Sequence, residues 1–142
     1  MQIVGFNLNK VSARKEANFK QGHINTNIEF TDLEKDKIDI LKDLEVMRLT
    51  FKFGLDYTES QEKKDKKLGE LIFEGNIKLA LSKEESKEMN KEWKKKTLPA
   101  GPRIFLFNYI LKKTAPKALL LQDELGLPSH IPIQQVTLKK DE

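Results

Sequence analysis

The segment from Val46 to Thr58, VMRLTFKFGLDYT, carries the clearest structural signal in the chain. Its apolar residues alternate with polar or small ones: Met47, Leu49, Phe51, Phe53, Leu55 and Tyr57 on one parity, and Arg48, Thr50, Lys52, Gly54 and Asp56 on the other. Because successive side chains of a β-strand point to opposite faces, this period of two predicts a strand with one buried and one solvated face. The fold is therefore expected to contain an antiparallel sheet that faces water on one side.

The same period returns downstream at 71–81, LIFEGNIKLAL. Gly75 falls on the apolar parity of this strand, where a missing side chain predicts a bend or room for a close neighbour. The lysine-rich segment 59–70, ESQEKKDKKLGE, is expected to be the hairpin loop that joins the two strands.

Two weaker alternations precede the central strand. Residues 23–30 alternate throughout, whereas between Val4 and Ala13 the apolar parity changes. A β-bulge near Asn9 would restore a single apolar face, since a bulge inserts one extra residue into a strand. The segment 31–45 fits either a short helix or the lead-in to the central strand.

Helices are expected after the strands. Ser82 and Glu85 have the spacing of a capping box, which predicts a helix that starts there and runs toward Lys96. This helix is polar, with Met89 and Trp93 as its main apolar residues, so it should rest lightly on the sheet.

The next helix is predicted at 103–113, RIFLFNYILKK, with Pro102 suited to its start. Its apolar residues surround the helix axis, and such a helix is normally buried on nearly all sides. One sheet face cannot cover all of it, so we expect a second cover: another subunit, which makes the protein a homo-oligomer (dimer or tetramer), or the segment that follows. Pro116 is expected to kink or restart the helix, and Gly126 suits its end.

That following segment, LGLPSHIPIQQV at 125–136, combines aliphatic residues with Pro128 and Pro132. The prolines disfavour a helix or a central strand, while the aliphatic residues disfavour a solvated tail. The sequence therefore predicts an extended ribbon that lies along an apolar surface, most simply over the 103–113 helix. A wall of a binding groove and a simple seal for the core both stay open.

Composition sets the remaining limits. The 142 residues fit one domain, 1–142, of two-layer α+β class. The chain has no cysteine and two histidines, and neither a signal peptide nor a membrane span is expected. We expect a soluble cytoplasmic protein. The net charge of +4 comes mostly from lysines in mixed Lys/Glu runs, which are typical of solvated surfaces rather than of nucleic-acid readout.

Motifs for catalysis or cofactors are not found. The sequence contains no glycine-rich phosphate loop or nucleophile elbow, and His23 and His130 are too far apart in sequence to suggest a zinc site. Both histidines are best explained as ordinary structural or solvated residues. We therefore expect neither an enzyme nor a cofactor. Asn108, inside the apolar helix, should have a partner: either the backbone of the ribbon or that of a bound peptide.

The chain resembles the SecB-type export chaperones. The resemblance rests on Phe73-Glu74-Gly75 with the alternation after them, on Leu98-Pro99, on Asn108-Tyr109-Ile110 and on Leu125-Gly126-Leu127-Pro128. It implies a four-stranded antiparallel sheet in the order 1-4-3-2 with two helices after it on one face. It also implies dimers or tetramers that act as an ATP-independent holdase for non-native polypeptides destined for export. Better-known members are strongly acidic, which helps them dock on the export motor, so the basic charge of this chain leaves the motor an open partner.

The expected client groove combines the ribbon with the start of the long helix. Its predicted peptide-binding residues are Trp93, Leu98, Phe105, Leu127, Ile131 and Ile133. Two alternatives remain: a basic protein associated with nucleic acid through Lys63, Lys64, Lys66, Lys67 and Lys94 to Lys96, or a structural interaction module without a groove.

Overall fold

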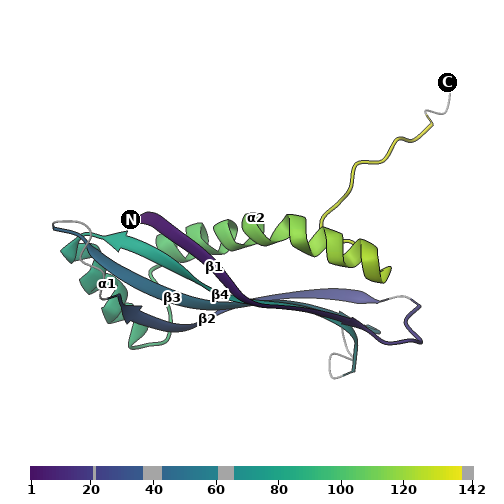
Figure 1. Cartoon of the computed structure of the whole chain (residues 1–142), viewed down its shortest axis with the longest axis horizontal. Helices are drawn as coiled ribbons and strands as arrows, with labels where there is room; N and C mark the ends of the chain where they lie inside the picture. The colour runs from purple at the N-terminus through teal and green to yellow at the C-terminus, as the bar shows by residue number, and fades with distance from the viewer. Residues whose placement is uncertain (21, 37–42, 61–65, 139–142) are drawn as a thin grey trace.

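The four strands form one antiparallel sheet, and both helices follow them in the chain. The computed structural model describes residues 1–20, 22–36, 43–60 and 66–138. Its elements are β1 (Gln2–Lys15), β2 (His23–Lys35), β3 (Glu45–Thr58), β4 (Lys67–Leu81), α1 (Lys83–Trp93) and α2 (Ala100–Leu125). The strand order is β1-β4-β3-β2, and α2 lies along one face of the sheet (Figure 1). The predicted two-layer α+β fold, with the order 1-4-3-2, is confirmed.

The apolar parity of the two central strands faces α2 and makes the core. Phe51, Phe53 and Phe73 are completely buried, and the rings of Phe53 and Phe73 stack with centroids 5.8 Å apart. The helix closes this layer from above, because Phe107 stacks on Phe30 of β2 with centroids 4.9 Å apart. The alternation read from β3 and β4 therefore gave the correct register.

Strand β1 reaches its neighbour with two irregularities. Its pairing with β4 shifts between Leu8 and Lys10, which confirms the bulge expected near Asn9, and it shifts a second time between Ile3 and Gly5. Gly75 explains how closely the strands approach at the first shift: a Cβ at this position would lie 2.1 Å from the Asn7 carbonyl oxygen. The missing side chain thus makes room for the neighbouring backbone.

Two strands are longer than predicted. Strand β4 begins at Lys67, inside the segment expected to be loop, and β2 continues to Lys35. The polar start of β4 has partners on the solvated face, since the Lys67 ammonium lies 3.0 Å from Glu70 and 3.5 Å from Asp56. Of the ambiguous segment 31–45, residues 37–42 lie outside the described residues.

Both predicted helices form, although α1 ends at Trp93 rather than near Lys96, and α2 begins at Ala100, before the predicted start at Arg103. Ser82 and Glu85 form the capping box at the start of α1. Helix α2, however, runs unbroken through Pro116 and ends at Gly126, whose φ of 68° is left-handed. Sheet-facing residues recur every fourth position on both sides of the proline: Leu106, Ile110, Thr114, Ala118 and Gln122. This continuous packing holds the helix together where the proline removes a backbone hydrogen bond. No helix among the described residues is long and apolar enough to cross a membrane.

Candidate polypeptide-binding surface

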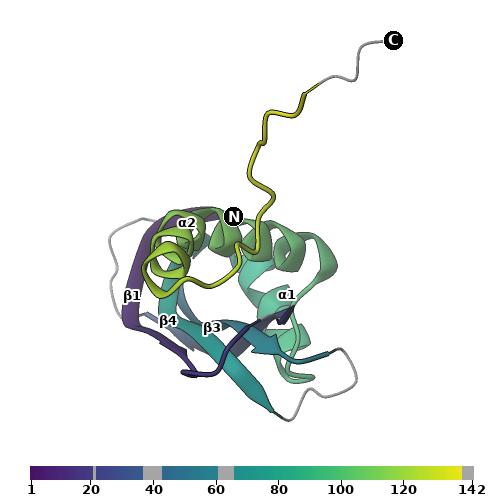
Figure 2. The ribbon, with the colours of Figure 1, turned by 90° about the vertical axis from the view of Figure 1, so that its right-hand side faces the viewer.

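The side of α2 that faces away from the sheet is partly apolar. Figure 2 looks along the molecule and shows α2 resting on the sheet with its other side open to solvent. Ile104 and Phe105 in the first turns are 58% and 52% exposed, and Leu120 near the other end is 58% exposed. The predicted surplus of apolar surface on this helix is therefore confirmed.

The proline ribbon divides into two parts with different surroundings. Leu127 is 6% exposed and packs against Gly69 of β4. A Cβ atom added to this glycine would lie only 3.2 Å from Cδ2 of Leu127. From Ile133 onward the segment extends away from the body on the α2 side of the sheet (Figure 1), with Val136 fully exposed. The first part therefore seals the core, as one of the two interpretations predicted. The expected position of the whole ribbon over the 103–113 helix is wrong.

A buried hydrogen-bond cluster fastens the first part of the ribbon. The Tyr57 hydroxyl donates to the Pro128 carbonyl oxygen at 2.8 Å and accepts from the Gln122 amide nitrogen at 2.8 Å. The same amide lies 3.0 Å from Nδ1 of His130, whose ring is 6.4 Å from that of Phe53. We name these four residues, Tyr57, Gln122, Pro128 and His130, the tyrosine clasp. It joins β3, α2 and the ribbon.

Burial changes the proton affinities of the two titratable members of the clasp. It raises the pKa of Tyr57 above the usual phenol value, partly offset by the hydrogen bond from Gln122, so the hydroxyl stays protonated and can donate. Burial also lowers the pKa of His130, which favours the neutral ring. His130 is thus the packed, hydrogen-bonded residue that the sequence suggested. Tyr57 and Gln122 were not predicted as its partners, because nothing in their spacing indicates a contact.

The structure does not bring the six predicted peptide-binding residues together. Trp93 and Leu98 belong to the α1 end of the sheet, whereas Leu127, Ile131 and Ile133 belong to the opposite end (Figure 1). The two groups are separated by most of β4, about 40 Å for twelve residues. Leu98, which is 1% exposed, and Leu127 lie in the core. Trp93 and Ile131 are half-buried, whereas Phe105 and Ile133 are exposed.

Asn108 does not contact the ribbon, the first of its two predicted partners, and contact with a bound peptide stays a prediction. It lies on the exposed side of α2, and its side chain makes no hydrogen bond to another described residue. The expected bridge to the ribbon backbone is therefore wrong, because the ribbon packs on the sheet instead. Water satisfies an exposed amide at little cost, so the residue needs no protein partner.

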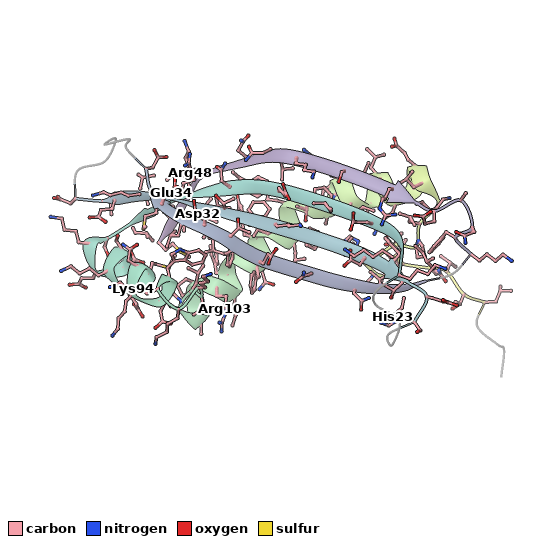
Figure 3. The ribbon with its side chains drawn as sticks, turned by 90° about the horizontal axis from the view of Figure 1, so that it is seen from below. His23, Asp32, Glu34, Arg48, Lys94 and Arg103 are labelled. Carbon is pink, nitrogen blue, oxygen red and sulfur yellow. The ribbon has the colours of Figure 1, made fainter. Side chains whose placement is uncertain are left out.

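The lysines proposed for nucleic-acid binding do not share one environment. Lys63 and Lys64 lie outside the described residues, and Lys67 pairs with Asp56 and Glu70. Lys94, at the end of α1, lies near Arg103 at the start of α2 in Figure 3, which views the polar face of the sheet. The Arg103 guanidinium donates to the Thr97 hydroxyl at 3.1 Å, and this contact fastens the start of α2 to the connection that precedes it.

Comparison with known proteins finds similarity at the level of structure. No family model matches the chain, and no curated protein matches it. Among solved structures, it is similar to a SecB-like chaperone of Mycobacterium tuberculosis, determined in complex with a ChAD peptide from the HigA1 antitoxin. The identity is 16%, the TM-score is 0.43, and the match covers 99% of this chain and 92% of the other.

Proposed function

We propose that this protein is an ATP-independent chaperone that binds non-native polypeptides and keeps them from aggregating. The outward side of α2 is the main binding surface in this proposal, with Phe105 and Ile104 as its strongest anchors. The exposed part of the C-terminal segment, which includes Ile133, is a second apolar element on the same side of the sheet.

The observation that carries the proposal is the exposure of large apolar side chains on a well-packed helix. Ile104, Phe105 and Leu120 keep more than half of their surface in water, although α2 is packed along its whole length on the other side. Ile104 and Phe105 are neighbours, and adjacent large apolar side chains left in water mark an interaction surface. Apolar contacts without fixed polar geometry suit a binder of many different unfolded chains.

Two further features support the same conclusion. The strand order β1-β4-β3-β2 with helices on one face is the arrangement that the resemblance to SecB-type export chaperones implied. In addition, Trp93 lies half-buried at the connection into α2, where it can border the surface formed by Ile104 and Phe105. Leu98 and Leu127 are core residues in this conformation, so in the proposal they support the surface from below and do not contact a client.

The experiment measures capture of a permanently unfolded, fluorescently labelled polypeptide by anisotropy. The test variant combines Ile104→Ser with Phe105→Ser. A matched control is Val4→Ser, which removes a side chain that is 47% exposed on β1. Loss of two apolar anchors should weaken binding about tenfold, which corresponds to about 1.4 kcal/mol. The control should bind like the unmodified protein.

Circular dichroism and solution mass accompany the binding curves, because a change in folding or assembly would mimic a loss of affinity. If the unmodified protein does not bind the unfolded polypeptide at micromolar concentration, the proposed function is wrong. If both variants bind with unchanged affinity, the binding surface lies elsewhere. Export as the destination of clients, and a motor that receives them, would require a separate test with a translocation-competent precursor.

A further inference from the structure

The positive charge of this protein is concentrated in its helical layer. From Lys94 to Gln122 the chain has seven cations, Lys94, Lys95, Lys96, Arg103, Lys112, Lys113 and Lys117, and no acidic residue. The rest of the chain then has 19 of the 26 lysines and arginines against all 22 acids, so its net charge is −3. The stretch comprises the connection after α1 and nearly all of α2, which lies on one side of the sheet (Figure 2).

The cations of this stretch are available to a partner. All six lysines are exposed, and none of them forms an ion pair with another described residue. Lys113 lies 5.7 Å from the centre of the Tyr109 ring, which leaves its charge uncompensated. Cations elsewhere are frequently paired: Arg48 with Glu34, and Lys78 with Asp36 at 3.5 Å. The first acids after the stretch are Asp123 and Glu124, in the last turn of α2.

These cations lie beside the exposed apolar side chains. Lys112 follows Phe105 by seven residues, which is two helical turns, so both lie on the same side of α2. Leu120 continues the surface eight residues further on. The distance along the axis from Phe105 to Leu120 is about 22 Å, enough to contact an extended peptide of about seven residues. The outward side of α2 therefore combines apolar anchors with unpaired positive charge.

Charge complementarity indicates which kind of partner fits the outward side of α2. A second copy docked through a two-fold contact at the middle of this surface would bring Lys112 and Lys113 of both chains into one interface, where the stretch provides no acid to pair with them. Single-stranded nucleic acid would find little to stack on, because Phe105 is the one largely exposed aromatic side chain among the described residues. An acidic polypeptide segment with apolar residues matches both features.

We propose that the outward side of α2 selects client segments in which aspartate or glutamate lies between apolar residues, and disfavours segments with lysine or arginine in the same place. This inference rests on the proposed chaperone function and adds the class of client to it. The apolar residues of a client contact Ile104 and Phe105 at one end and Leu120 at the other, while the carboxylates between them pair with Lys112, Lys113 and Lys117. Because these pairs are exposed, the selectivity should weaken as salt rises.

The test uses three labelled peptides of about seven residues, chosen to span the surface, with the same apolar residues at both ends. Their central positions hold glutamates, glutamines or lysines. At low ionic strength the glutamate peptide should bind about fivefold tighter than the glutamine peptide, since several exposed pairs each contribute a little. The lysine peptide should bind more weakly than both. At high salt the three affinities should converge.

Two variants that lose the same number of positive charges test whether the preference for the glutamate peptide depends on the lysines of α2. Lys112→Gln, Lys113→Gln and Lys117→Gln combined should abolish the preference for the glutamate peptide and leave the glutamine peptide unaffected. The matched control changes three exposed lysines away from α2, Lys10, Lys20 and Lys66, to glutamine. It should keep the preference, because a net-charge effect without a defined surface would reduce it equally in both variants.

Each other outcome overturns the inference in a distinct way. If the glutamine peptide binds and no charge preference is seen, the inference fails while the chaperone function stands. If none of the peptides and no unfolded polypeptide binds, the function itself fails. A single-stranded RNA of matched charge that binds more tightly than the glutamate peptide, and is lost in the α2 variant, would identify nucleic acid as the partner. A fall in solution mass in the Ile104→Ser variant would identify a second copy.

Discussion

Removal of one hydroxyl group, in the Tyr57→Phe variant, tests whether the tyrosine clasp stabilises the fold. Tyr57 is completely buried, and its ring can stay in place because phenylalanine has nearly the same shape. The substitution removes the hydrogen bond to the Pro128 carbonyl and the one from the Gln122 amide, each 2.8 Å long. At about 1 kcal/mol for each bond, the free energy of unfolding should fall by about 2 kcal/mol.

Two compensations keep the loss near this value. The Gln122 amide retains its contact with Nδ1 of His130, and Pro128 is an exposed residue, so the ribbon can shift to expose its carbonyl to water. Urea unfolding is the assay. For a protein of this size the denaturant dependence is about 2 kcal/mol per molar urea, so the midpoint should move by about 1 M.

Tyr109→Phe is the matched control, since it removes the same atom from a half-buried tyrosine whose hydroxyl has no hydrogen bond to another described residue. Its midpoint should change by less than about 0.5 kcal/mol. Hydrogen exchange in residues 127–131 should increase in Tyr57→Phe alone, because the clasp fastens this segment. Equal midpoints for the two variants would refute the reasoning and show that the clasp contributes nothing to stability.

Four further outcomes are expected. Phe51→Ala and Phe73→Ala should each lower the free energy of unfolding by about 3–5 kcal/mol, as both side chains are completely buried, and unchanged urea midpoints would contradict the register. Gly75→Ala should cost about 1–3 kcal/mol, measured in the same way, because the new methyl group would collide with the backbone of β1. Burial lowers the pKa of His130 below its ordinary 6.5, so the unfolded chain takes up a proton at a higher pH than the folded protein does. The free energy of unfolding should therefore fall as the pH drops below about 6.5, and His130→Gln should flatten this part of the plot of stability against pH. Light scattering over a dilution series should find a homo-oligomer, because the unpaired edge of β1, where Val4 and Val11 are exposed, can pair with another copy; a monomer at every micromolar concentration would contradict this.

The surface through which copies associate decides whether the outward side of α2 is free for clients. If copies associate through another surface, such as the unpaired edge of β1, where Val4 and Val11 are exposed, the outward side of α2 stays free for clients. If they associate through α2, the client surface is reduced to the exposed C-terminal segment. Solution mass of the Ile104→Ser variant distinguishes these arrangements, so it should be measured before the binding curves are interpreted.

The sequence by itself determined the elements and the identity of the core. Alternation in β3 and β4 named the buried residues correctly, since a strand shows each parity to one face regardless of what covers it. Local signals also located the capping box at Ser82, the bulge near Asn9 and the left-handed end of α2 at Gly126, because each of these depends on a few neighbouring residues. The strand order 1-4-3-2 came from the resemblance to a known family, since alternation alone does not say which strands pair.

Only the tertiary structure decided how the ribbon and the long helix are used. Periodicity shows that a segment is apolar but not which of two apolar surfaces it contacts. The ribbon was therefore placed along the 103–113 part of α2, although hydrogen bonds fasten it to Tyr57 of the sheet and to Gln122 in the last turns of α2. Proximity in sequence was equally misleading for the groove, because α2 carries the chain the full length of the sheet and separates Trp93 and Leu98 from Leu127. Pro116 shows the same limit: its local preference to break a helix is overcome by packing on both sides of it, which no local pattern reports.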